Sequence, residues 1–128
     1  MDTGSKTTIW VGRVMSALPI LFLTADGIAK LIKPVQVVEA TVKLGYPESV
    51  IFGLGVVLLI CTILYAIPRT SVLGAILLTG YLGGATATHV RVGDPLFPIL
   101  FPGLMGALIW GGLYLRDGRL RELLPLRK

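Results

Sequence analysis

The chain contains little charge and few of the side chains on which redox or metal chemistry depends. Of its 128 residues, only 15% are charged and 54% are hydrophobic, a balance typical of membrane proteins rather than soluble domains. It has a single cysteine, Cys61, and a single histidine, His89. A thiol–disulfide enzyme working alone and a haem held by two histidines of one chain are therefore excluded. A flavin or nucleotide fingerprint is also absent from the sequence, so any electrons would be carried by a partner or a bound cofactor.

Four long apolar runs dominate what is there. They cover residues of about 9–32, 49–67, 71–90 and 95–115. As a helix, each is long enough to cross a hydrocarbon core of roughly 30 Å. The sequence therefore predicts an all-α integral membrane four-helix bundle that forms a single domain over residues 1–128. A signal peptide, with Lys6 and Arg13 before an apolar core at 14–23, is an alternative for the first run, but the apolar pattern continues past Asp26.

The segment between the first two runs has a different pattern. Its polar or small residues recur at helical spacing, at Gln36, Glu39, Ala40 and Lys43, which makes one polar stripe. Glu39 precedes Lys43 by four residues, the favourable order for a helical ion pair. Gly45 followed by Pro47 is a typical helix stop. These features predict a short amphipathic helix in the membrane interface, with an ordinary structured loop as the alternative.

Lysine and arginine are unevenly distributed between the two sides of the predicted bundle. With four spans, both termini and the Pro68-Arg69 turn share the side that is richer in these residues. The other side carries Lys30, Lys33, Lys43 and Arg91. The positive-inside rule places the richer side in the cytoplasm. The interpretation is a multi-pass protein of the bacterial cytoplasmic (inner) membrane with both termini cytoplasmic.

The predicted cytoplasmic tail, residues 116–128, is basic with interspersed leucines. The net charge of +5 comes largely from the two termini, which indicates contact with anionic membrane lipid rather than nucleic acid. Leu120, Leu123 and Leu124 could face lipid while the arginines meet phosphates. A frayed, solvated tail is the alternative.

Five ionisable residues far apart in sequence share the outer end of the predicted bundle. They are Asp26, Lys30, His89, Arg91 and Asp94. Ionisable groups near the bilayer interior are costly and typically mark function, so these residues are the predicted ligand site. The structural alternatives are a local Asp26–Lys30 ion pair and a hydrogen bond from His89 to Asp94 or Asp26. A zinc site would need a further ligand and lacks diagnostic spacing, so no metal is predicted.

Small residues form stripes on the third and fourth runs. Gly80, Gly84 and Thr88 lie on one face of the third run, and Gly103, Ala107 and Gly111 lie on one face of the fourth. Such stripes allow backbones to approach closely in lipid. They predict packing within the bundle, with dimerisation as the alternative. Pro98 and Pro102 are expected to bend the fourth run beside the polar residues, which favours a cavity there.

Several short motifs together resemble a known family. They are the stretch Phe22 to Leu31, with Asp26-Gly27 and Lys30; the loop ending Leu44-Gly45-Tyr46-Pro47; and Gly80 to His89 followed by Asp94-Pro95. In order and spacing they are similar to the DoxX-like family of small four-span bacterial membrane proteins, over nearly the whole chain. The resemblance implies a four-helix bundle and an association with membrane redox systems, since relatives of the namesake include a subunit of a thiosulfate:quinone oxidoreductase. Asp26 stands where a small neutral residue often precedes the Gly-x-x-Lys element.

Three functional hypotheses follow. The first is a non-catalytic subunit of a membrane redox assembly that binds a quinone or lipid-like ligand near its outer end and docks a protein partner. The second is an amphiphile transporter or scaffold that acts as a homodimer, since four spans are few for alternating access. The third is an intramembrane enzyme in which Asp26 and His89 move a proton. A covalent cofactor and a nucleic-acid partner are not expected, whereas membrane lipid is.

Overall fold

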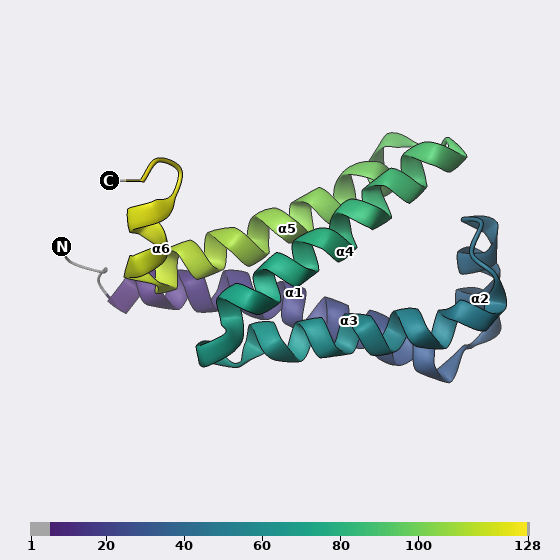
Figure 1. Ribbon diagram of the computed structural model, residues 1–128, viewed down its shortest axis with the longest axis horizontal. Helices are drawn as coiled ribbons and strands as arrows, with labels where there is room; N and C mark the ends of the chain where they lie inside the picture. Colours follow the sequence, from purple (N-terminus) through teal and green to yellow (C-terminus); the bar gives the residue numbers. More distant parts are fainter. Residues whose placement is uncertain (1–5, 128) are drawn as a thin grey trace.

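The structure is a computed structural model that describes residues 6–127, which fold into helices joined by short turns (Figure 1). Two of these helices are short 3-10 segments, η1 and η2. In chain order the elements are α1 (Lys6–Ile32), α2 (Val35–Lys43), η1 (Glu48–Val50), α3 (Ile51–Ala66), η2 (Pro68–Thr70), α4 (Ser71–Val92), α5 (Leu96–Arg116) and α6 (Gly118–Leu123). The last residue of the predicted tail, Lys128, lies outside the described residues.

The predicted spans correspond to the four long helices. α1, α3 with η1, α4 with η2, and α5 are each long and apolar enough to cross a membrane. Most of their large side chains stay outside the bundle interior, as lipid-facing residues do; examples are Trp10, Leu21, Ile63, Ile76 and Leu100. The predicted all-α bundle, with the short helix α2 between the first two spans, is confirmed. The protein is therefore a multi-pass membrane protein with four candidate spans.

The four long helices pack as a closed sequence of neighbours, α1 with α3, α3 with α4, α4 with α5, and α5 with α1. Figure 1 shows that the α1–α3 pair and the α4–α5 pair converge at one end and diverge toward the other. We call the convergent end, which holds η2 and α6, the closed end. The opposite end, which holds α2 and the α4–α5 turn, is the open end.

A buried chain of hydrogen bonds ties three helices together at the closed end. The Tyr65 hydroxyl donates to the carbonyl oxygen of Ile109 at 2.7 Å. Because that hydroxyl has only one proton, the Ser16 hydroxyl must donate to Tyr65 Oη, 2.7 Å away. Arg116 Nε in turn donates to Ser16 Oγ at 3.2 Å. This network joins α1, α3 and α5, and every buried member has a partner, which is what a stable buried network requires.

Glycines set the closest helix contacts, but they are not those of the predicted stripes. A side chain at Gly74 would collide with the backbone of Tyr65, and a Cβ at Gly12 would lie 2.9 Å from the carbonyl oxygen of Gly112. By contrast, a Cβ at Gly80 or Gly84 would meet nothing within 4 Å. The prediction that these two pack against another helix of the same bundle is therefore wrong, while the dimerisation alternative stays a prediction. The packing face of α4 runs instead through Gly74, Ala75, Leu78 and Leu82.

The fourth span shows a similar offset of one residue. Gly112 packs against the backbone of α1, whereas a Cβ at the predicted Gly111 would meet only the end of the Met15 side chain. Gly103 faces open space. The predicted close approach of this span is thus correct, but it is made through Gly112 and not through the stripe that begins at Gly103.

The prediction for the C-terminal tail needs one correction. Leu120, expected to face lipid, is buried, whereas Leu123 and Leu124 are exposed. The reason is that α6 begins directly after Asp117, whose carboxylate accepts from the Arg119 amide at 2.9 Å, and packs back on α5. In α2 the polar stripe is exposed as predicted.

The expected ion pair within α2 is also wrong. Among the ion pairs of residues 6–127, none joins Glu39 to Lys43. Instead, Lys33 Nζ, at the start of the connection between α1 and α3, lies 3.6 Å from Glu48 Oε2 in η1. Both of these side chains are solvent-accessible, so this pair contributes little to stability. The connection is therefore positioned by other contacts, which lie at the open end of the bundle.

Candidate functional site

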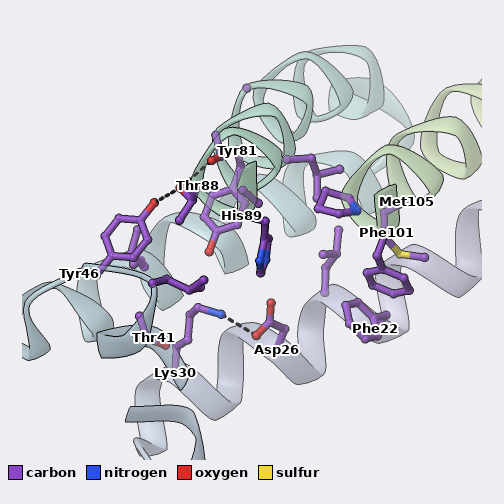
Figure 2. Close-up of a pocket in the computed structure, with 18 residues that line it drawn as sticks. Phe22, Asp26, Lys30, Thr41, Tyr46, Tyr81, Thr88, His89, Phe101 and Met105 are labelled. Carbon is purple, nitrogen blue, oxygen red and sulfur yellow. Dashed lines mark hydrogen bonds and ion pairs between the residues drawn. The ribbon is translucent and has the colours of Figure 1, made fainter. Parts of the chain in front are cut away.

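A cavity of about 440 Å³ lies at the open end, between α1, α4, α5 and the segment that contains α2 (Figure 2). Its two halves differ in chemistry. One half is polar and is lined by Asp26, Lys30, Thr41, Tyr46, Thr88 and His89. The other half is apolar: Phe22, Phe101 and Met105 lie together there (Figure 2), and Leu54, Leu82 and Pro102 also line the cavity. The volume is within the range of about 300–1,000 Å³ typical of small-molecule sites.

Asp26 and Lys30 supply the α1 side of the polar half. The Lys30 ammonium donates to Asp26 Oδ1 at 2.6 Å, one helical turn away. The Lys30 side chain is 14% exposed and that of Asp26 is 34% exposed, so the pair is shielded from lipid without being fully dehydrated. Figure 2 shows the second carboxylate oxygen of Asp26 pointing into the cavity. The local pair predicted from the sequence is formed, and it leaves one oxygen free to meet a ligand.

His89 enters the cavity from the last turn of α4, with Asp94 beside it. Asp94 Oδ2 lies 2.5 Å from His89 Nδ1. The contact results from the way in which α4 ends, over residues 89–94. Gly93, at φ +76°, donates to the carbonyl oxygen of Val90 at 3.1 Å, and the Asp94 amide donates to that of His89 at 3.0 Å. These two hydrogen bonds form the Schellman motif, a common way for a helix to end at a glycine. The motif brings Asp94, which follows Gly93, back against His89 in the last turn of α4.

The geometry assigns different roles to the two nitrogens of the His89 ring. His89 lines the cavity and Asp94 does not. Nδ1 is engaged by Asp94, and among residues 6–127 no other group hydrogen-bonds the ring. Nε2 is therefore the nitrogen available to a bound molecule. A carboxylate that orients an imidazole in this way is the usual means of fixing its tautomer.

Two tyrosines complete the polar half, and sequence reasoning missed both. Thr88 donates to the carbonyl oxygen of Gly84 at 2.8 Å, so the Tyr46 hydroxyl is the donor in its 2.9 Å contact with Thr88 Oγ1. The ring of Tyr81 reaches into the cavity in Figure 2, and its hydroxyl has no hydrogen-bond partner among residues 6–127. Tyr81 shares a helical face with Thr88, which is the signal that could have identified it.

Arg91 contacts the loop after α2 rather than the cavity. Its Nη2 donates to the carbonyl oxygen of Leu44 at 2.7 Å, just after α2 ends. It does not line the cavity, because it points from α4 toward the loop. Of the five predicted site residues, the structure thus brings Asp26, Lys30 and His89 to one cavity. Asp94 and Arg91 each contact a residue that lines it.

Metal-ligating clusters are absent from the part of the chain that the structure describes. Within residues 6–127, no group of three or more His, Cys, Asp or Glu side chains could hold an ion. Cys61 is buried in α3 and is not one of the residues that line the cavity. The chemistry of the site therefore rests on hydrogen bonding, on the two acid–base pairs and on apolar contact.

Four candidate spans with a cavity at one end define a small helical membrane protein. Comparison with protein families identifies the particular family: residues 14–112 match the DoxX-like family model. The chain therefore belongs to the DoxX-like family, as its motifs indicate. The match runs from the first span almost to the end of α5, so it includes Asp26, Lys30 and His89. Neither curated proteins nor solved structures give a significant match.

Proposed function

We propose that this DoxX-like protein is a non-catalytic subunit of a membrane redox assembly that holds a quinone or lipid-like amphiphile in the open-end cavity. The observation that carries the proposal is the division of one cavity into a polar half and an apolar half. A ligand with a polar head and an apolar tail can satisfy both halves at once. Membrane lipids and quinones reach such a site directly from the bilayer.

The apolar half is suited to hold a ring or chain. Phe22 of α1 and Phe101 of α5 meet edge to face, with ring centroids 5.0 Å apart. These rings give a large apolar contact area without buried polar atoms. The polar groups at the other end then fix the orientation of the head, which is the division of labour typical of small-molecule sites.

A second function, an intramembrane acid–base enzyme, is favoured by one specific observation. The 2.5 Å contact between His89 and Asp94 resembles the histidine–carboxylate pairs that move protons in enzymes. Identification of the molecule that co-purifies with the protein separates the two functions. An amphiphile recovered chemically unchanged after long incubation supports the binding subunit, whereas its conversion supports the enzyme.

The proposed function predicts a loss of ligand when Asp26 is neutralised. In Asp26→Asn, the ion pair with Lys30 and the anionic acceptor in the cavity are both lost, so occupancy should fall about tenfold or more. The protein should be extracted mildly and its bound small molecules quantified by mass spectrometry. Glu39→Gln, which removes an exposed carboxylate of α2 at the same end, is the control. Full occupancy of Asp26→Asn would leave Asp26 with a structural role only.

The proposed orientation places the open end outside the cytoplasm, in a bacterial inner membrane, because the closed end carries more lysine and arginine. In a background of Cys61→Ala, Val92→Cys at the open end should react with a membrane-impermeant thiol reagent in intact cells. Arg119→Cys in α6 should react only after the membrane is permeabilised. The opposite labelling pattern would place the cavity on the cytoplasmic side.

A further inference from the structure

The polar half of the cavity has no cation to spare for an anionic head. Lys30 is the one lysine or arginine among the described residues that line it, and it is already paired with Asp26 at 2.6 Å. Arg91 is engaged by the Leu44 carbonyl. A phosphate or carboxylate head would bring a second negative charge beside Asp26, with Lys30 as the one lysine or arginine of the described lining to balance both. This arrangement is costly where solvent is limited.

The tautomer of His89 determines which hydrogen bond it can offer. The Asp94 carboxylate accepts but cannot donate, so it holds the ring proton on Nδ1. With the ring neutral, Nε2 carries a lone pair and accepts. A molecule in the cavity therefore meets an acceptor from α4. It satisfies that acceptor only by donating a proton of its own.

A second acceptor lies on α1. Asp26 uses one carboxylate oxygen for Lys30, and the other points into the cavity (Figure 2). A head with carbonyl oxygens alone could accept from Tyr81, but it would leave both His89 Nε2 and the free Asp26 oxygen without a donor. Once a bound head displaces water from these two acceptors, leaving them unpaired costs more than a single hydrogen bond contributes. The cavity therefore favours ligand head groups that can donate hydrogen bonds over head groups that can only accept them.

We infer that the ligand of this cavity has an uncharged, hydroxylated head that donates a hydrogen bond to His89 Nε2, with Asp94 as the positioning residue that fixes the tautomer. This inference rests on the proposed function, because it names the chemical class of the amphiphile held there. Hydroxylated ring heads and glycerol heads share this chemistry. Heads that offer only carbonyl groups and anionic heads do not.

Matched probes with similar tails test the head-group preference. The purified full-length chain in nanodiscs of zwitterionic lipid is titrated anaerobically with decylhydroquinone, decylbenzoquinone, monolauroylglycerol and dodecyl phosphate, and binding is followed by native mass spectrometry. Decylhydroquinone should bind about tenfold more tightly than decylbenzoquinone, which corresponds to about 1.4 kcal/mol. Dodecyl phosphate should bind more weakly than either hydroxylated probe. Comparison of decylhydroquinone with monolauroylglycerol then separates ring heads from glycerol heads.

The variant Asp94→Asn tests the role of the tautomer. A carboxamide can donate as well as accept, so it no longer holds the proton on Nδ1. The preference for decylhydroquinone over decylbenzoquinone should therefore disappear, and Asp94→Glu should restore part of it. Asp117→Asn, a capping position at the closed end where asparagine also caps well, should keep the full preference. Equal weakening of both probes in Asp94→Asn would reduce Asp94 to a structural role and overturn the inference.

The remaining outcomes separate the inference from the proposed function. If decylbenzoquinone or dodecyl phosphate binds best, the cavity still holds an amphiphile but the inferred head chemistry is wrong. If none of the four probes binds and mild extraction recovers no amphiphile, the proposed function fails, and the inference fails with it.

Discussion

Gly74→Ala should destabilise the bundle by about 3 kcal/mol or more, well beyond an ordinary surface substitution. The new Cβ would lie 2.7 Å from the carbonyl carbon of Leu64 and closer still to the backbone of Tyr65. The clash is with backbone, so no side-chain movement relieves it. The hairpin there is also fixed by the Ser71 hydroxyl, which donates to the carbonyl oxygen of Tyr65 at 2.7 Å. α3 and α4 would have to separate, which disrupts the buried network around Tyr65.

Gly84→Ala is the matched control for this substitution. It changes the same residue type on the same helix, but its Cβ meets nothing within 4 Å. Thermal unfolding in detergent should show a lower midpoint for Gly74→Ala and little change for Gly84→Ala. Equal midpoints for the two variants would show that the α3–α4 contact is not as close as the structure has it.

Gly84→Leu should abolish ligand binding while leaving the fold intact. Gly84 lines the cavity, and the space beside it is open. A leucine side chain there occupies volume that the ligand needs and leans toward Gly80, one helical turn before it, which also lines the cavity. Co-purified ligand, quantified by mass spectrometry, should fall below a tenth of the parental amount. The unfolding midpoint should stay close to that of the parent protein, since no packed contact is disturbed.

Gly83→Leu provides the control for added bulk on α4. Gly83 is exposed and also has open space around it, but it does not line the cavity. This variant should keep both ligand and stability. Loss of ligand from both variants would point to a general effect of leucine on α4 rather than to the filling of a cavity.

Sequence reasoning was sufficient for the spans but not for the faces through which they pack. Length and apolar composition identify four helices because spanning requires both. The packing face of α4 was missed because lipid is as apolar as a bundle interior, so hydrophobic periodicity does not distinguish the two sides. The helical spacing of Gly80 and Gly84 predicts a helix–helix contact, although small residues also leave space for a cavity. Only the tertiary arrangement separates these two uses.

The polar half of the cavity was partly predictable for a clear energetic reason. Asp26, Lys30 and His89 stand out in sequence because ionisable groups near lipid are expensive. Tyr46 and Tyr81 did not stand out, because tyrosine is common at membrane interfaces for unrelated reasons. The assignment of Arg91 to the site overlooked the carbonyl groups at the end of α2, which need donors once that helix stops.

Both polar pairs of the cavity are formed within single spans, and this affects how the protein can be made. Asp26 and Lys30 are one turn apart on α1, and the His89–Asp94 contact is built by the helix stop of α4 alone. Each charge therefore acquires its partner as soon as its own helix exists, before any other span is present. During biosynthesis the two segments can enter the bilayer one after the other, each with its ionisable groups already hydrogen-bonded to one another, at a lower insertion cost than unpaired groups would incur. Lateral association of finished helices then brings the two pairs to opposite walls of one site, so assembly of the cavity does not require a charge to cross lipid alone.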